Sequence, residues 1–344
     1  MANGAFTQFQ PTDIINSVDS QTGTLWSNNV PRLTEVYTSS VQSTSNSGQY
    51  FVHVYQTSST LSTAAVQFDI AYADEQGSGS LLYNSLVSGK SPSSTIYGQY
   101  QNIALGDDTE PFIFGDLTSS YFYALSFERA RYKESLALGT MALALSSSNG
   151  SGPELHLTDN SNISTGNNFG NAGRVFQVVS GSEGTVYTGV NANGFSKESG
   201  SYGLFLPDVG LILLNGRALD GLTAHGGIAL GTNRSNNVNG NNMGKLFASL
   251  SGSIFAKSQT FRLNSQETLA SDFYFVRAQN SEFNYSSNPS FVSGSTGQLL
   301  WSQMQNNPQT FITTVGLYND ANELCAVAKL SRPLAKDFTK ELLV

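Results

Sequence analysis

Hydrophobic and polar residues alternate along much of the chain. The clearest stretch is Val66-Gln67-Phe68-Asp69-Ile70-Ala71-Tyr72, in which large apolar residues occupy every second position. Because successive side chains of a strand point to opposite faces, this pattern predicts a half-buried strand. Similar patterns, bounded by clusters of Gly, Ser and Asn that are typical of turns, predict further strands at 50–55, 121–127, 174–179, 209–214 and 273–278.

Helical periodicity is sparse. Met243, Leu246, Phe247 and Leu250 follow the spacing i, i+3, i+4, i+7, which predicts one short amphipathic helix. The apolar run at 209–214 is followed by Asn215-Gly216, a pair that predicts a tight turn after a buried strand. We therefore expect an all-β fold of short, mostly antiparallel strands in two β-sandwich-like modules with one short helix.

The length of the chain predicts more than one domain. Single cores rarely grow beyond about 250 residues, and this chain has 344. A Ser- and Gly-rich stretch at 146–152 predicts a boundary near 148, which gives an N-terminal β-domain at 1–148 and a C-terminal β-domain at 149–344. A second polar stretch, at 231–240, indicates a possible subdivision of the latter near 235.

The composition is poor in charge. Charged residues make up 12% of the chain, about half the usual share, and aromatic residues make up 11%. The aromatic content argues against disorder. Low charge with abundant Tyr and Phe is typical of surfaces that face other subunits, although a merely polar monomer is the alternative interpretation.

The net charge of −8 argues against general nucleic-acid binding, which requires a basic surface. No apolar stretch approaches the length of a membrane-spanning helix, so we expect no membrane insertion. The first eight residues lack the features of a secretory leader, and we expect the chain to be made and kept in a cytosol-like compartment. A single cysteine, Cys325, excludes an internal disulfide.

Residues that carry chemistry are few. The three histidines, His53, His156 and His225, are widely separated, and the sequence contains no metal-ligand spacing, nucleophile elbow or phosphate loop. Cys325 lies in an apolar, strand-like setting and is expected to be buried. We therefore expect no enzymatic activity, no metal and no cofactor. A loop with Asp107, Asp108 and Glu110 keeps open the alternative of a glycosidase carboxylate pair, against a solvated loop.

Three basic residues follow the aromatic strand predicted at 121–127. If that strand continues, Arg129, Arg131 and Lys133 share one face and form a basic stripe. Such a stripe would contact an acidic strip on a neighbouring subunit and select the partner. The alternative is an exposed edge strand that its charges protect from aggregation.

The C-terminal region predicts a β-hairpin from two alternating stretches at 307–320 and 323–330. Thr313, Val315, Leu317 and Tyr318 lie on its first strand and are candidate interface residues, because a strand edge can pair with a neighbour's sheet. Pro333 in the segment that follows disfavours regular pairing.

Several segments in the same order carry a resemblance to a known family. Segments 96–103, 128–133, 203–210 and 282–289 together resemble virion structural proteins of T-even-like marine cyanophages. The hairpin, with Ile312-Thr313-Thr314-Val315-Gly316-Leu317-Tyr318 and Leu324-Cys325-Ala326-Val327-Ala328, is similar to the baseplate-proximal part of tail-collar and tail-fibre proteins. The resembling proteins continue further, which leaves open whether the C-terminus is complete.

The resemblance implies a non-enzymatic virion structural protein of a contractile-tailed phage, at the baseplate as a wedge-associated or tail-fibre-connecting subunit. The implied partners are other phage structural proteins and copies of the chain, and the implied location is the virion tail, assembled in the host cytoplasm. Two alternatives remain: a capsid decoration or neck/head-fibre protein, and a carbohydrate-binding or carbohydrate-cleaving tail protein.

Overall fold

The chain forms two compact units in a computed structural model that describes residues 6–40, 50–79, 91–107, 109–147, 154–169, 172–188, 200–235 and 241–344. Unit 1 comprises residues 1–19 and 269–344, and unit 2 comprises residues 20–268. The chain passes between the units through strands β1 (Ile14–Thr24) and β16 (Asn264–Tyr274). These two strands are hydrogen-bonded neighbours in a three-stranded sheet that ends with β8 (Ser135–Leu136).

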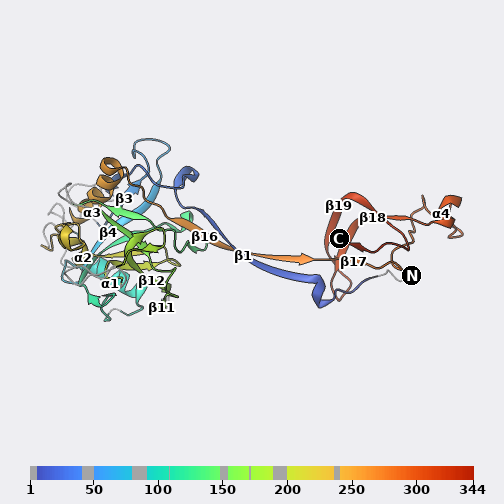
Figure 1. The fold of residues 1–344 in the computed structure, drawn as a ribbon, viewed down its shortest axis with the longest axis horizontal. Helices are drawn as coiled ribbons and strands as arrows, with labels where there is room; N and C mark the ends of the chain where they lie inside the picture. The colour runs from blue at the N-terminus through green and yellow to red at the C-terminus, as the bar shows by residue number, and fades with distance from the viewer. Residues whose placement is uncertain are drawn as a thin grey trace. The chain divides into compact units, whose positions relative to one another are not determined.

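Unit 2 is built on one large curled antiparallel sheet (Figure 1). Its main path, in spatial order, is β2 (Tyr37–Ser40), β3 (Phe51–Tyr55), β4 (Val66–Asp74), β7 (Tyr121–Ser126), β15 (Leu211–Asn215), β14 (Gly203–Leu206), β12 (Gly173–Ser182), β10 (Leu155–Asp159) and β9 (Leu143–Leu145). Two short strands, β11 (Asn167–Phe169) and β13 (Thr185–Val186), also pair with β12, and β5 (Ile113–Phe114) pairs with β6 (Leu117–Thr118).

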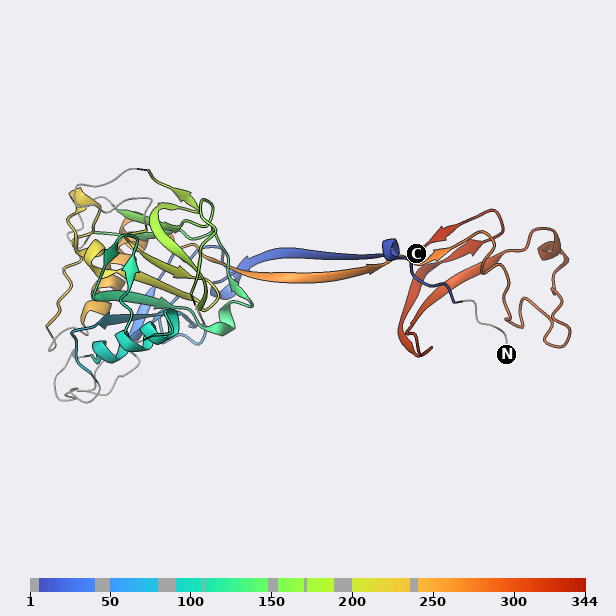
Figure 2. The ribbon, with the colours of Figure 1, turned by 90° about the horizontal axis from the view of Figure 1, so that it is seen from below.

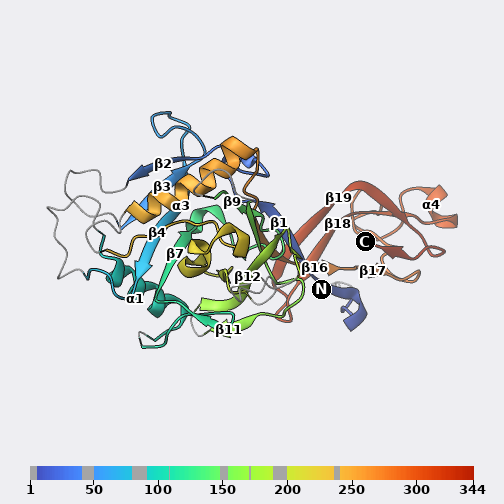
Figure 3. The ribbon, with the colours of Figure 1, turned by 60° about the vertical axis from the view of Figure 1, so that its left-hand side comes forward.

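Both faces of this sheet are covered, and each has its own core. On one face Phe68, Ile70 and Tyr72 of β4 join a cluster that includes helix α3 (Asn241–Ser251), which packs against β3 and β4 (Figure 3). On the other face Ala71 of β4 joins a cluster that includes helix α1 (Ser93–Ala104). Figure 2 gives a second view of this arrangement. The alternation of the sequence thus separates two buried faces.

The all-β expectation is confirmed, and the strands predicted at 50–55, 66–72, 121–127, 174–179 and 209–214 correspond to β3, β4, β7, β12 and β15. The helix predicted from Met243 to Leu250 is α3. Asn215-Gly216 does not form the predicted tight turn. Instead, the Asn215 side chain accepts a hydrogen bond from the Arg217 N–H and caps the short helix α2 (Gly216–Asp220).

The division of the chain differs from the predicted one. The boundary expected near 148 falls among residues outside those that the structure describes, but β9 and β10, on either side of it, pair with each other in one sheet. The expected subdivision near 235 also falls within unit 2. There the Thr232 N–H and hydroxyl both donate to the Asp220 carboxylate, and Arg234 pairs with Asp74 of β4, so this polar stretch is anchored to the sheet.

Unit 1 contains the elements near the two ends of the chain. A 3-10 turn at Pro11–Asp13 precedes β1, and β17 (Arg277–Ala278) pairs with β20 (Leu342–Leu343). Helix α4 (Ser302–Asn306) precedes the long hairpin of β18 (Thr310–Tyr318) and β19 (Leu324–Lys336). The predicted C-terminal hairpin is therefore confirmed. The strand predicted at 273–278 is divided, because β16 ends at Tyr274 and β17 begins at Arg277.

Candidate functional site

Unit 1 exposes most of its apolar side chains and buries few. Among its described residues, three apolar side chains are buried: Ala278, Phe291 and Val292. Neither hydrophobic core cluster includes a described residue of this unit. Eighteen large apolar side chains are exposed in it: Phe6, Phe9, Ile14, Ile15, Val18, Leu269, Phe273, Tyr274, Phe283, Tyr285, Leu300, Trp301, Phe311, Tyr318, Leu324, Val327, Phe338 and Leu343. We call this set the exposed apolar set.

The β18–β19 hairpin is the largest element of this surface. Among the residues that the structure describes, it forms a two-stranded sheet, so one edge of each strand is unpaired there. The register shifts between Ile312 and Thr314, where Ile312 pairs with Leu334 and Thr314 pairs with Lys329, and Pro333 lies in the irregular part of β19. The proline thus sits where it interrupts the fewest ladder hydrogen bonds. An isolated two-stranded hairpin is marginally stable in water, so this one needs further contacts.

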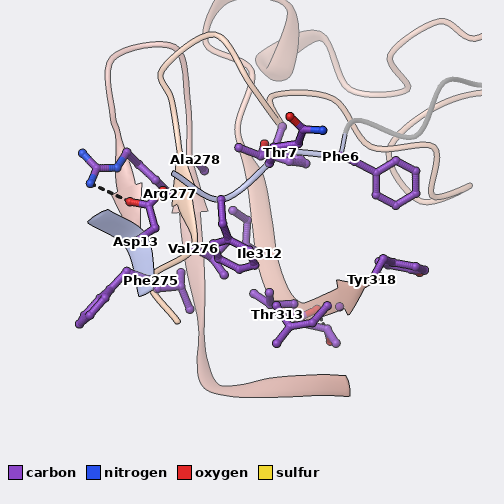
Figure 4. Close-up of a pocket in the computed structure, with 18 of the residues that line it drawn as sticks. Phe6, Thr7, Asp13, Phe275, Val276, Arg277, Ala278, Ile312, Thr313 and Tyr318 are labelled. Carbon is purple, nitrogen blue, oxygen red and sulfur yellow. Dashed lines mark hydrogen bonds and ion pairs between the residues drawn. The ribbon is translucent and has the colours of Figure 1, made fainter. Parts of the chain in front are cut away.

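The first strand of the hairpin borders a pocket of about 810 Å³ within unit 1 (Figure 4). The four candidate residues, Thr313, Val315, Leu317 and Tyr318, all line it. Val315 and Leu317 are half-buried, whereas Thr313 and Tyr318 are exposed. The opposite wall is the N-terminal segment, whose Phe6 ring lies edge-on to the Tyr318 ring with the centroids 5.1 Å apart.

An ion pair holds this N-terminal segment in place. The Arg277 Nη2 lies 3.1 Å from the Asp13 Oδ1, and the Asp13 side chain is nearly buried (Figure 4). The Asp13 carboxylate also accepts a hydrogen bond from the Gln10 N–H. The pocket wall is therefore fixed by polar contacts next to aromatic rings that remain exposed.

A buried lysine anchors the end of the hairpin. Lys336, the last residue of β19, is fully buried, and its Nζ donates to the Asn280 carbonyl, the Asn284 Oδ1 and the Asp337 carbonyl at 2.9 to 3.1 Å. A buried ammonium must fill its three donor positions with acceptors. These contacts tie the hairpin to the 280–284 loop, and the sequence carried no signal that Lys336 would be buried.

The basic stripe is not formed as expected. The strand does not continue, because β7 ends at Ser126 and residues Arg129–Arg131 form a 3-10 turn. The Arg131 Nη1 donates to the Ser27 Oγ, and burial lowers the pKa of this half-buried guanidinium. Lys133 pairs with Glu267, with 2.6 Å between Nζ and Oε1. Arg129 lies over the Tyr132 ring. All three basic side chains are thus engaged within unit 2, and their role at an interface stays a prediction.

The acidic loop is solvated where it is described. Asp107 and Glu110 are exposed, and Asp108 lies outside the described residues. Hydrogen bonds from the Thr109 hydroxyl and N–H lower the pKa of the Asp107 carboxyl. The general acid of a glycosidase needs a raised pKa, whereas the pKa of the Asp107 carboxyl is lowered. The arrangement favours the interpretation as a solvated loop.

Cys325 is exposed, which contradicts the expectation that it is buried. Its apolar, strand-like setting predicted burial, but β19 belongs to a two-stranded sheet with few covering residues. In the part of the chain that the structure describes, no group of three or more His, Cys, Asp or Glu side chains is placed to hold a metal ion. Within the same residues, no helix combines the length and apolar character required to cross a bilayer.

Comparison with known proteins adds no relative. No protein-family model, curated protein or solved structure matches the chain.

Proposed function

We propose that the chain is a non-enzymatic structural subunit of a contractile-tailed phage particle, associated with the baseplate as a wedge-associated or fibre-connecting protein. It assembles with copies of itself and with other structural proteins through unit 1. The sequence resemblance is the basis for proposing a phage particle and a location at the baseplate. The exposed apolar set supplies the assembly surface, and it is the observation that carries the proposal.

The area of this set is large enough for a stable interface. Its side chains are between 36% and 68% exposed. At roughly 200 Å² for a large aromatic side chain, the set amounts to on the order of 1,500 Å² of apolar surface per chain. A standard interface buries about 800 Å² per partner, and obligate oligomers bury more and are more hydrophobic. The summed area exceeds that of a standard interface, which supports a role of unit 1 in assembly.

The hairpin provides a second means of association. Its two unpaired edges present main-chain N–H and C=O groups to a strand of a neighbouring chain. Apolar side chains of the exposed apolar set, among them Val327 on β19 and Phe311 on β18, flank these edges. Pairing at an edge together with burial of these side chains would complete the sheet that the single chain leaves open.

The proposal is tested first with the purified chain. Val327 is 59% exposed on β19, so Val327→Asp disturbs few contacts within one chain but places a charge in the proposed interface. The matched control is Leu222→Asp, because Leu222 is 62% exposed on unit 2. We expect sedimentation to show an oligomer for the wild type and for Leu222→Asp, and dissociation for Val327→Asp. An oligomer that is equally stable in both variants would contradict the assembly role of unit 1.

The location is tested by imaging the whole particle. Density for the chain around the tail axis with threefold or sixfold symmetry supports the baseplate. Occupancy of the icosahedral shell or the neck would instead identify a decoration or fibre protein and refute the proposed location.

A further inference from the structure

A second pocket lies on unit 2, beside helix α1. It has a volume of about 520 Å³, which falls in the range of small-molecule sites. Helix α1 forms one wall, and β4 and β7 of the large sheet contribute to its floor. It is lined by Tyr50, Phe51, Asp69, Ala71, Ile96, Gln99, Tyr100, Ile103, Ser126, Val209 and Leu211.

A polar row crosses three adjacent strands at this pocket. His53 of β3 is the register partner of Asp69 of β4, and Asp69 is the register partner of Ser126 of β7. Directly opposed residues of antiparallel strands share one face, so the three side chains stand side by side. In the next strand, β15, the row ends at the apolar Leu211. A polar row on a covered sheet face requires a reason, because burial of unpaired polar groups is costly.

Asp69 is the centre of the row. One carboxylate oxygen, Oδ1, lies 2.5 Å from the His53 Nδ1, and the other, Oδ2, has no hydrogen-bond partner among the described residues. The Asp69 side chain is 21% exposed. Burial raises the pKa of the Asp69 carboxyl, while the hydrogen bond and charge of His53 lower it, and Glu128 raises it further. The ionised carboxylate would therefore gain from a cation in the pocket.

The walls also suit a cation with an apolar body. Among the described residues that line the pocket, none is Lys or Arg, and the basic partner of Asp69, His53, is not one of the lining residues. Three aromatic side chains, Tyr50, Phe51 and Tyr100, surround the same space. Burial raises the pKa of the Tyr100 phenol to about 12, so it stays neutral. Aromatic faces next to a carboxylate are a typical environment for alkylammonium groups.

We propose that this pocket binds a small organic ammonium ion, whose charge pairs with Asp69 and whose alkyl groups lie against Tyr50, Phe51 and Tyr100. An anion would meet the Asp69 carboxylate, and no Lys or Arg is among the described residues that line the pocket, so the pocket disfavours it. A neutral sugar would use the polar row but would bring no positive charge to the Asp69 Oδ2. The ammonium ion satisfies both the free oxygen and the aromatic walls.

The test uses butylammonium and tetramethylammonium as probes and measures affinity by titration calorimetry and by chemical-shift changes. Butanol, a neutral molecule of similar shape, is the comparison probe on the wild-type chain. We expect saturable binding of the two ammonium ions and affinity for butanol at least about tenfold lower. Equal affinity for butanol and butylammonium, or no saturable binding of either ammonium ion, would overturn the proposal. This comparison needs no variant and so does not depend on the folding of one.

Two variants locate the binding. Asp69→Asn keeps the shape of the side chain and removes its charge, and we expect it to weaken butylammonium binding at least about tenfold. The matched control is Asp116→Asn, since Asp116 is exposed and does not line the pocket. Unchanged affinity in Asp69→Asn, or an equal loss in Asp116→Asn, would remove Asp69 from the site. Saturable binding of glucose in place of the ammonium ions would assign the pocket to sugars and refute the charge-based assignment.

Discussion

The pair of Asp74 and Arg234 gives the sharpest test of what holds unit 2 together. Asp74 ends β4 with a side chain that is 1% exposed, and Arg234 reaches it from the polar stretch before α3. The two parallel contacts measure 2.9 Å, from Nε to Oδ2, and 2.7 Å, from Nη2 to Oδ1. The Tyr72 hydroxyl and the Gln76 N–H also donate to the carboxylate. We predict that Arg234→Met destabilises unit 2.

The magnitude follows from what the substitution leaves behind. Removing one partner of a buried ion pair costs about 3–5 kcal/mol, because the other charge stays buried without compensation. The Arg234 side chain is 36% exposed, and Asp74 keeps two donors, so the lower end of that range applies: about 3 kcal/mol. For a unit of this size, about 2–4 °C per kcal/mol corresponds to a fall in Tm of about 6–12 °C.

Thermal and urea unfolding of Arg234→Met, Asp74→Asn and the double variant measure the effect. If the unpaired charge is the cause, Asp74→Asn in the Arg234→Met background should recover at least about 1.5 kcal/mol. Arg234→Met within about 0.5 kcal/mol of wild type, or a double variant no more stable than Arg234→Met, would refute the reasoning.

Three further changes test other parts of the fold. Lys336→Met should destabilise unit 1 by about 3 kcal/mol, because three acceptors lose a buried donor. Amide hydrogen exchange in β19 should accelerate, and unchanged protection of these amides would contradict the prediction. Gly203→Ala should destabilise unit 2 by about 2–3 kcal/mol in urea unfolding, since the new Cβ would lie 2.1 Å from the Leu213 carbonyl oxygen of the adjacent strand. A variant as stable as the wild type would contradict this close approach of the two strands. Burial acts to raise the pKa of Asp208, but the hydrogen bonds from the Arg174 side chain and N–H, together with the charge of Arg174, hold this pKa below its usual value. The pair with Arg174 therefore stabilises the fold above about pH 4, and this stabilisation is lost as the pH falls through the lowered pKa. Arg174→Met should therefore lower stability more at pH 6 than at pH 3, and a pH-independent difference would argue against the pair.

The spacing of apolar residues along the sequence predicted the strands and the helix that bury one apolar face. Phe68, Ile70 and Tyr72 lie together in one core because a strand alternates its faces, whatever the neighbouring strands are. Leu246 and Leu250 likewise face the sheet because they share one side of α3. Helix α1 was missed, since its Ser, Thr, Tyr, Asn and Gly residues are weak helix formers, although Ile96, Tyr97 and Ala104 do share a helical face.

The candidate site was predictable only in part. The hairpin that contains Val315 and Leu317 was predictable from the alternation along β18, and the structure contains this hairpin. The exposed apolar set does not follow, because the same alternation is typical of strands with a covered face. The polar row at Asp69 was also missed, since His53 and Ser126 become its neighbours only through strand pairing.

The sequence by itself determined the all-β class, the faces of the main strands, the helix from Met243 and the C-terminal hairpin, because each depends on residues that are close in the chain. The tertiary structure alone decided the division into units, the engagement of the basic residues and the exposure of Cys325. Arg131 meets Ser27 across 104 positions, and β9 meets β10 across the predicted boundary. Such contacts depend on which distant strands pair, and no local pattern carries that information.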